Sequence, residues 1–249
     1  MKLEAIKLMF IMNDSILKLE PHVHTNFSDG MDYKIMLKAA VKLNIDVIAI
    51  TDHDTMGAIK PAMKFLKTCN KKYGKNLILI PAEEIRVKGN IEILAYFINE
   101  QIKPNLSLEE TIDKIHEQGG LIALAHPFRP PLYYKKNVKI LQNYKLDGIE
   151  IWNFGFPPFL NERSCALAKN FPKLFRIGGT DAHFYWQFGL VRNYLKSEPD
   201  IEGIFKALKN NKNKVENVWL GIPYYFYYFH KFFLKNRKIL ANLMRNQKK

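Results

Sequence analysis

Short apolar segments alternate with amphipathic segments along most of the chain, and this alternation restricts the fold more than any other feature. Seven short segments rich in Ile, Leu and Val are predicted to be β-strands: 16–24, 46–51, 77–85, 91–98, 121–126, 148–153 and 174–181. Six segments carry apolar residues at helical spacing: 32–43, 55–73, 107–118, 137–144, 160–170 and 201–210. Alternation of this kind predicts an α/β protein with a mainly parallel sheet, either open or closed into a barrel.

Local signals refine this prediction at two places. Ser107 and Glu110 have the spacing of a capping box, and Gly119-Gly120 follows the same segment, so a helix is expected between them. Only a short turn through Gly89-Asn90 separates the third and fourth predicted strands. Because this turn is too short for a helix, those two strands are expected to form an antiparallel hairpin.

Composition places the chain among globular proteins. It has 249 residues, of which 47% are hydrophobic, and this excludes wholesale disorder. Two cysteines, Cys69 and Cys165, are too few for a disulfide framework, which favours a reducing compartment and a cytoplasmic location. No apolar run of about 20 residues is present, and the N-terminus lacks the pattern of a signal peptide.

The formal net charge is +14, and half of it lies in the last 33 residues. We therefore expect a domain at 16–216 and a basic, aromatic and helical tail at 217–249, where eight aromatic residues occupy ten positions from Tyr224 to Phe233. An excess of positive charge suggests a polyanionic partner, or it only aids solubility. The tail itself has three interpretations: packing on the barrel or on another subunit, contact with an anionic membrane surface, or binding of nucleic acid.

Polar residues cluster where the predicted strands end, although the strands themselves are apolar. They are His22, His24, Asp52, His53, Asp54, Glu83, Glu84, His126, Glu150, Asp181 and His183. In an α/β barrel or a doubly wound sheet, the carboxyl ends of the strands converge on one face. Burying this many imidazoles and carboxylates is costly unless they are paired or bind metal ions.

The spacing of these residues supports a metal site. Side chains at i and i+2 of an extended segment point the same way, so His22 and His24 can bind one ion. Asp181 and His183 repeat this arrangement. Imidazole and carboxylate ligands suit Zn²⁺, Mn²⁺ or Fe²⁺. The residues therefore predict a metal site.

The order of these motifs resembles the PHP family, named for polymerase and histidinol phosphatase. The matching residues are His22-Val23-His24-Thr25, Ser28-Asp29-Gly30, Thr51-Asp52-His53-Asp54, Glu84, His126-Pro127 and Gly179-Thr180-Asp181-Ala182-His183. The resemblance covers about residues 16–215. It implies a distorted seven-stranded (β/α) barrel with two or three divalent metal ions, which hydrolyses phosphate esters.

Carried over by position, the resemblance implies three metal positions. The ligands of the first would be His22, His24, Glu84 and Asp181. The second would be held by Asp29, His53 and His183, and the third by Glu84 and His126. Many relatives add a histidine at the third position, where this chain has Glu92. A carboxylate there favours harder ions such as Mn²⁺ or Mg²⁺; alternatively, Glu92 does not bind and two ions remain.

Other polar residues have less specific expectations. Arg129 is expected either to bind a phosphate group or to be a surface cation, and Glu150 to support the site from a neighbouring strand. Asp52 and Asp54 are expected to orient His53 or to cap a helix. Adjacent strand residues face opposite sides, so only one of Glu83 and Glu84 can reach the metal ions. The resemblance to the PHP family favours Glu84, which leaves Glu83 facing outward or behind the ligands. Asn153 is a candidate for substrate contact, and His116 is expected on a solvated helix face.

The expected function is hydrolysis of a phosphomonoester or a short nucleotide by a metal-activated water. A 5′-directed exonuclease acting on short RNA or DNA is the enzymatic alternative. A barrel that only binds its ligand is the alternative from another class. The expected partner is a phosphorylated small molecule or nucleotide. Binding of nucleic acid and contact of the tail with a membrane are further alternatives. The oligomeric state stays open.

Overall fold

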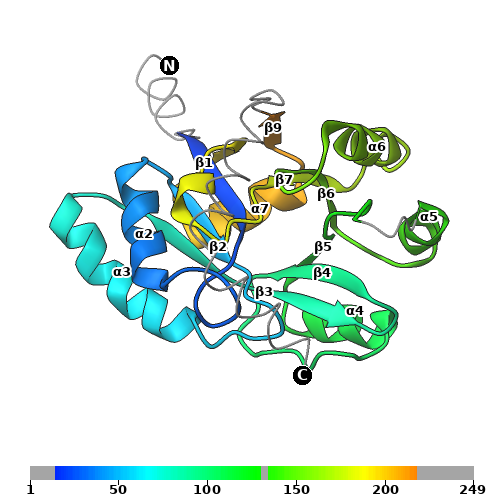
Figure 1. Ribbon diagram of the computed structural model, residues 1–249, viewed down its shortest axis with the longest axis horizontal. Coiled ribbons are helices and arrows are strands. Elements are labelled where there is room, and N and C mark those ends of the chain that lie inside the picture. The colour runs from blue at the N-terminus through cyan, green and yellow to red at the C-terminus, as the bar shows by residue number, and fades with distance from the viewer. Residues whose placement is uncertain (1–14, 130–133, 218–249) are drawn as a thin grey trace, which may run out of the picture. The chain divides into compact units, whose positions relative to one another are not determined.

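Nine strands form one sheet in residues 15–129 and 134–217, the parts of the chain that this computed structural model describes (Figure 1). The strands are β1 (Ser15–Val23), β2 (Val47–Ile50), β3 (Ile78–Val87), β4 (Ile91–Tyr96), β5 (Leu121–Leu124), β6 (Gly148–Asn153), β7 (Phe175–Gly179), β8 (Val191–Ser197) and β9 (Asn213–Asn217). The helices are α2 (Tyr33–Lys42), α3 (Ile59–Tyr73), α4 (Leu108–Glu117), α5 (Tyr134–Asn143), α6 (Pro158–Lys169) and α7 (Ile201–Lys209), with a 3-10 turn η1 (Tyr185–Gln187).

The strands from β1 to β7 lie in the sheet in chain order, and the sheet curves into a nearly closed barrel. Parallel pairing joins β1, β2 and β3, and it also joins β5, β6 and β7. An isolated parallel bridge between Val23 and Ala182 links the end of β1 to the segment after β7. The carboxyl ends of β1 and β7, which carry predicted ligands, therefore lie side by side.

The α/β class and the β3–β4 hairpin are confirmed, whereas the expected number of seven strands is too low. The hairpin is antiparallel. Its residue pairs run from Ala82 with Tyr96 to Val87 with Ile91. The two additional strands, β8 and β9, pair antiparallel with β1 and with each other. Both strands contain many polar residues: β8 alternates buried and exposed positions, and β9 has the sequence Asn-Lys-Val-Glu-Asn. Neither strand is therefore the kind of apolar segment by which the other strands were predicted. The expected tail at 217–249 lies almost entirely outside the described residues.

Helix ends follow the local signals in the sequence. Ser107 and Glu110 form the expected capping box at α4, in which each side chain accepts a hydrogen bond from the other residue's backbone N–H. The side chain of Asp32 accepts hydrogen bonds from two backbone N–H groups at the start of α2. The α3 helix begins at Ile59, four residues later than expected, after the turn that carries His53. Among the described residues, no helix has both the length and the apolar character needed to cross a membrane.

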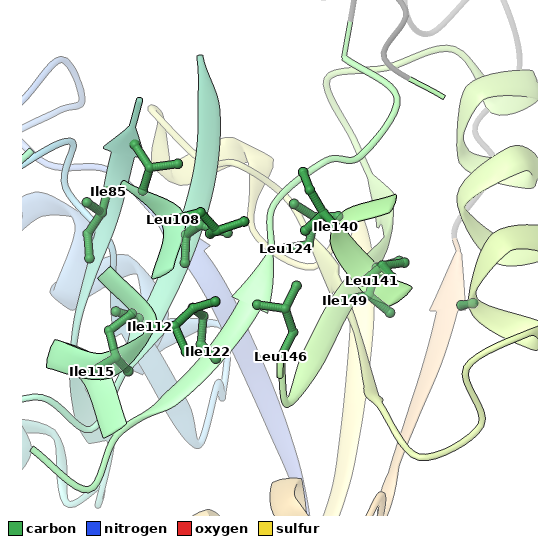
Figure 2. Close-up of a cluster of buried hydrophobic side chains, with 14 of the residues drawn as sticks. Ile85, Leu108, Ile112, Ile115, Ile122, Leu124, Ile140, Leu141, Leu146 and Ile149 are labelled. Atoms are coloured by element: carbon green, nitrogen blue, oxygen red, sulfur yellow. The ribbon is translucent and has the colours of Figure 1, made fainter. Parts of the chain in front are cut away.

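The core has an inner and an outer part because successive strand residues point to opposite faces of the sheet. Val47 and Ala49 of β2 belong to an inner cluster, while Ile48 and Ile50 pack outward against α2 and α3. A second outer cluster fills the space between the sheet and α4, α5 and α6, and Figure 2 shows Ile122 and Leu124 of β5 within it. Burial of these side chains stabilises the barrel by roughly 1.5–3 kcal/mol each, and it holds the strand ends in fixed positions.

Candidate metal centre

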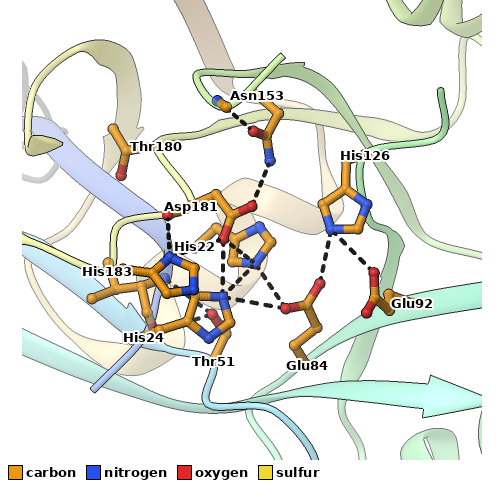
Figure 3. A network of polar contacts seen from close by, with 12 residues as sticks. His22, His24, Thr51, Glu84, Glu92, His126, Asn153, Thr180, Asp181 and His183 are labelled. Atoms are coloured by element: carbon orange, nitrogen blue, oxygen red, sulfur yellow. Dashed lines mark hydrogen bonds and ion pairs between the residues drawn. The ribbon is translucent and has the colours of Figure 1, made fainter. Parts of the chain in front are cut away.

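Five histidines and four carboxylates from six strand ends converge at the carboxyl edge of the barrel (Figure 3). The structure thereby brings together all nine residues expected to bind metal: His22, His24, Asp29, His53, Glu84, Glu92, His126, Asp181 and His183. Every one has a ligand atom within 4.8 Å of at least two others in the same group. The folding of the chain therefore creates a single cluster from residues spread over 162 positions of sequence, from His22 to His183.

The tightest group contains two imidazoles and two carboxylates. His24 Nε2 lies 3.0 Å from Asp181 Oδ1, 3.3 Å from Glu84 Oε2 and 3.1 Å from His22 Nε2. His22 Nε2 lies 3.2 Å from the same Glu84 oxygen and 3.6 Å from Asp181 Oδ1. Two imidazole nitrogens thus each lie within 3.6 Å of oxygens from Glu84 and Asp181, ligand types that Zn²⁺ binds.

Two further groups adjoin this one. His183 Nε2 lies 3.1 Å from Asp29 Oδ2, and His53 Nε2 lies 4.0 Å from the same oxygen. On the opposite side, His126 Nε2 lies 3.0 Å from Glu84 Oε1 and 3.6 Å from Glu92 Oε2. Glu84 therefore lies between the groups, with one oxygen facing each side (Figure 3).

Burial and charge together shift the pKa values of this cluster. Burial alone would lower the pKa of His22 and His24, but the adjacent carboxylates outweigh it; they raise the pKa of His24 to about 9 and that of His22 well above its usual range. Burial likewise opposes ionisation of Glu84 and Asp181, yet the histidines lower the pKa of both carboxyls. The cluster thus attracts positive charge, which protons or metal ions can supply.

One observation fits a divalent metal rather than a network of hydrogen bonds. The buried Nδ1 of His24 has no hydrogen-bond partner among the described residues. Buried polar atoms are normally paired, so this unpaired nitrogen fits a site that binds metal ions. Imidazole and carboxylate groups are suitable ligands for such ions.

The backbone is strained at two of these residues. His126 and Asp181 have φ values of 20° and 51°, in a region that non-glycine residues rarely adopt. Such conformations cost about 1–3 kcal/mol each and persist only where the surroundings enforce them. Glu150 provides one such constraint, because its Oε2 accepts the backbone N–H of His126 at 2.7 Å.

The polar residues next to the candidate ligands lie partly where they were expected. Glu150 is buried behind the cluster, with its Oε1 atom 3.0 Å from His22 Nδ1. Asn153 Nδ2 lies 3.4 Å from Asp181 Oδ2, so this amide contacts a candidate ligand. Asp52 neither orients His53 nor caps a helix: its oxygens accept hydrogen bonds from the backbone and side chain of Thr25 and from Ser28 Oγ. It therefore shapes the loop that carries Asp29.

Glu83 faces away from the cluster, which is one of the two positions expected for it; it is buried and accepts the backbone N–H of Ile102. Two other expectations need correction. Asp54 accepts the backbone N–H of Arg86 instead of capping a helix. His116 is partly buried, and its Nε2 lies 3.1 Å from Asp147 Oδ2. In each case the partner comes from a distant segment, so the sequence carried no local signal for the contact.

Glu92 and Arg129 contact each other at the edge of the cluster. Arg129 Nη1 donates to Glu92 Oε2, and Arg86 Nε lies 3.8 Å from Glu92 Oε1. The two arginines and Glu92 line a cavity of about 360 Å³ that also reaches His126. Arg129 remains about half exposed. Its guanidinium therefore lies beside the cluster and faces a space large enough for a substrate group.

Glu20 is a buried carboxyl that the sequence pattern did not reveal. It pairs with Ile48 of the outer cluster, and the β1–β2 register shifts between Glu20 and Val23, before the strand reaches the candidate ligands His22 and His24. The two oxygens of Glu20 accept hydrogen bonds from Thr180 Oγ1 at 2.8 Å and from the backbone N–H of Gly189 at 2.7 Å. Burial raises the pKa of Glu20 to about 7. The signal that was available is an acidic residue within an apolar strand, two positions before a candidate ligand.

Comparison with known proteins agrees with this geometry. Residues 20–170 match the family model of the PHP domain. An uncharacterized protein of Methanocaldococcus jannaschii, MJ1587, is 36% identical over 150 residues, which cover 55% of this chain and 82% of that protein. The 5′-3′ exoribonuclease Rnm of Escherichia coli is 35% identical over 107 residues, covering 41% of this chain and 35% of Rnm.

The fold is similar to that of a solved structure as well. A two-domain protein from Bacteroides vulgatus, described as containing a predicted PHP-like metal-dependent phosphoesterase, superposes with a TM-score of 0.65 at 19% identity. The match covers 82% of this chain and 65% of that protein, so this chain spans just under two thirds of its length. Motifs, family model and barrel agree, and the chain belongs to the PHP domain family.

Proposed function

We propose that this protein is a metal-dependent phosphoesterase, which hydrolyses a phosphomonoester or a short nucleotide. The observation that carries this proposal is the position of Glu84, whose carboxylate lies within 3.3 Å of a ring nitrogen of four histidines. Those histidines are His22, His24, His53 and His126. A buried carboxylate among imidazoles has the chemistry of a ligand shared between two ions.

The distances support three ligand groups. The first contains His22, His24, Glu84 and Asp181, and the second contains Asp29, His53 and His183. The third contains Glu84, Glu92 and His126. We propose Mn²⁺ or Mg²⁺ for the third group because two of its ligands are carboxylates, while Zn²⁺ and Fe²⁺ also suit the imidazole-rich groups.

Bound divalent ions lower the pKa of a water molecule and neutralise charge on phosphoryl oxygens, which is the chemistry that ester hydrolysis needs. The protein residues prepare the site for this step. Glu150 accepts a hydrogen bond from His22 Nδ1–H and so leaves the Nε2 lone pair directed into the cluster. Asn153 contacts Asp181, and we propose that Arg129 binds a phosphate oxygen from the adjacent cavity.

Alanine substitutions at His22 and Asp181 test the proposal. We expect each variant to lose release of phosphate from p-nitrophenyl phosphate in the presence of Mn²⁺, because each substitution removes a ligand from the tightest group. A matched control is His116→Ala, which removes a histidine whose ring contacts Asp147 outside the cluster. Circular dichroism shows whether each variant is folded. Full activity in both His22→Ala and Asp181→Ala would refute the assignment.

A 5′-directed exonuclease is the second candidate, favoured by the 35% identity to the exoribonuclease Rnm over 107 residues. The test compares turnover of a short 5′-phosphorylated oligonucleotide with turnover of mononucleotides. Faster turnover of the oligonucleotide supports the nuclease, whereas preference for mononucleotides without salt-sensitive oligonucleotide binding argues against it. A barrel that only binds its ligand is disfavoured because all nine candidate ligands are present in one cluster.

A further inference from the structure

Two neighbouring helices of the barrel carry only positive formal charge. The α2 helix contains three lysines and α3 contains five, and neither helix contains Asp or Glu. All eight side chains are exposed: Lys34, Lys38, Lys42, Lys60, Lys64, Lys67, Lys71 and Lys72. We call these eight residues the α2–α3 basic face. By contrast, α4 contains four acidic residues and one lysine, so the charge is not spread evenly over the helices.

The lysines lie at spacings that place them on one side of each helix. On α2 they recur every fourth residue, and on α3 Lys60, Lys64, Lys67 and Lys71 recur at intervals of three or four. The two helices pack side by side against β2 (Figure 1). Lys38 Nζ of α2 lies 5.7 Å from the centroid of the Phe65 ring of α3. The lysines of α2 and α3 therefore lie on neighbouring helices, and Lys38 of α2 reaches the side of α3 that carries Phe65.

The α2–α3 basic face begins beside the candidate metal centre. The α2 helix starts four residues after Asp29, and α3 starts six residues after His53. Both helices follow the carboxyl ends of β1 and β2, so their amino termini lie at the edge of the barrel that holds the centre. Lys34 and Lys60, in the first turns of these helices, are the lysines of the basic face nearest to that edge.

Aromatic rings connect the basic face with the centre. Phe27 lies in the loop that carries Asp29 and is 41% exposed. Its ring centroid is 6.0 Å from that of Tyr33, which is in turn 6.1 Å from that of Phe65. Lys34 Nζ lies 5.6 Å from the Tyr33 ring centroid. The three rings therefore form a chain of contacts from Phe27, in the loop that carries Asp29, to Phe65 on α3, and Lys34 and Lys38 lie over two of these rings.

We infer that the α2–α3 basic face and Phe27 bind a single-stranded nucleic acid whose terminal phosphodiester reaches the candidate metal centre. Lysines that follow a backbone, together with aromatic rings that stack on bases, are the features by which proteins bind single strands. An anionic membrane would also attract the lysines, but it offers no base to stack on Phe27 and no phosphodiester chain to enter the centre. This inference rests on the proposed phosphoesterase function and narrows its substrate to an oligonucleotide.

The test measures binding of a fluorescein-labelled, hydrolysis-resistant phosphorothioate single strand of twelve nucleotides by anisotropy, with Mn²⁺ present. The variant replaces Lys34, Lys38, Lys60 and Lys64 with glutamine. We expect its Kd to rise about tenfold or more, and the slope of log Kd against log salt to fall by about 3, since each lost phosphate contact removes about 0.7. The substituted side chains are exposed, and thermal melting checks that the variant is folded.

A matched control removes the same number of charges elsewhere. It replaces Lys169, Lys173, Lys209 and Lys212, which are exposed and lie outside α2 and α3, with glutamine. We expect its Kd to stay within about twofold of the unmodified protein, because these lysines contact no phosphate in the inferred complex. An equal loss of binding in both variants would show a general effect of net charge and would overturn the inference.

Phe27→Ala tests the aromatic contact. It should weaken strand binding about tenfold, which is the usual effect of losing one stacked base. The control Tyr144→Ala removes another exposed aromatic side chain at the end of α5 and should not change binding. Unchanged binding in Phe27→Ala, with loss in the lysine variant, would overturn the stacking part of the inference.

Two further readouts separate the sources of failure. If the protein hydrolyses p-nitrophenyl phosphate but binds the strand equally well with and without the four lysines, this inference fails and the proposed function stands. If the lysine-dependent binding is present without hydrolysis of any phosphate ester, the proposed function fails instead. Lysine-dependent sedimentation with phosphatidylserine vesicles, in the absence of strand binding, would identify a membrane surface and overturn the inference.

Discussion

Glu150 of β6 lies 3.0 Å from His22 Nδ1 of β1 and orients this imidazole from behind the candidate metal centre. The same carboxylate accepts the backbone N–H of His126 at 2.7 Å. One buried side chain thus positions two candidate ligands that belong to different metal groups. Carboxylates that hold ligating histidines in this way determine which ring nitrogen carries the proton.

Glu150→Gln should weaken metal binding about 10- to 100-fold, because an amide orients the imidazole less well than a carboxylate does. The measurement is the Mn²⁺ concentration that gives half-maximal phosphatase activity. The control Glu162→Gln changes an exposed residue of α6 and should behave like the unmodified protein. An unchanged Mn²⁺ requirement in Glu150→Gln would mean that the contact with His22 has no role in binding metal.

Gly179→Ala should reproduce the defect of Glu150→Gln although Glu150 is retained. A Cβ at Gly179 would lie 1.8 Å from Glu150 Oε1 and 3.0 Å from His22 Cβ, so the carboxylate must move. Gly178→Ala is the matched control: its Cβ would meet Val191 and Val215, so it should lower Tm without changing the Mn²⁺ requirement. If both glycine variants change only Tm, the close approach of Gly179 does not serve the centre.

Glu92→Gln should reduce the number of bound ions by one per chain, as measured by elemental analysis after equilibration with Mn²⁺. The reason is that an amide is a poor ligand for hard cations, while Glu92 Oε2 lies only 3.6 Å from His126 Nε2. Arg129→Gln is the informative comparison because it removes the other partner of Glu92. We expect it to raise KM and leave the metal content unchanged; an unchanged metal content in Glu92→Gln would assign Glu92 to Arg129 alone.

Addition of Mn²⁺ to chelator-treated protein should raise Tm. A ligand at 100 times its Kd stabilises the folded state by about 2.7 kcal/mol, which corresponds to roughly 5 °C or more for a domain of this size. Relief of repulsion between the clustered carboxylates contributes to this effect. Differential scanning fluorimetry measures the shift, and EDTA should reverse it. The same shift in His22→Ala would mean that the ions bind elsewhere.

Glu83→Gln should alter the pH dependence of stability. Burial raises the pKa of Glu83 to about 7 in the folded state, from 4.5 in the unfolded chain. As the pH rises, the unfolded chain therefore loses this proton before the folded protein does. The stability associated with the neutral carboxyl is complete below pH 4.5 and is lost as pH rises through about 7. This loss is about 3 kcal/mol, and glutamine avoids it.

Urea unfolding at pH 5 and pH 8 checks this prediction. The free energy of unfolding of Glu83→Gln relative to the unmodified protein should be larger at pH 8 than at pH 5, by about 3 kcal/mol. Glu109→Gln, an exposed substitution on α4, should show no such difference. A constant difference between Glu83→Gln and the unmodified protein at both pH values would contradict the prediction.

Local patterns predicted the elements that depend on neighbouring residues. The capping box of α4 and the β3–β4 hairpin arise from contacts within a few positions, so their signals are short and readable. The strands β8 and β9 were missed because a polar strand at the end of a sheet depends on pairing with a distant strand. For the same reason, the contact of His116 with Asp147 across 31 positions had no local signal.

By itself, the sequence determined the alternating α/β pattern and the placement of His, Asp and Glu at strand ends, because residue type and spacing are local properties. Residue spacing could not choose between Glu83 and Glu84; the tertiary structure places Glu84 at the cluster and Glu150 beside His22. It also decided that the lysine-rich helices α2 and α3 are neighbours. These outcomes depend on which segments pack together, and burial of apolar surface across the whole barrel controls that packing.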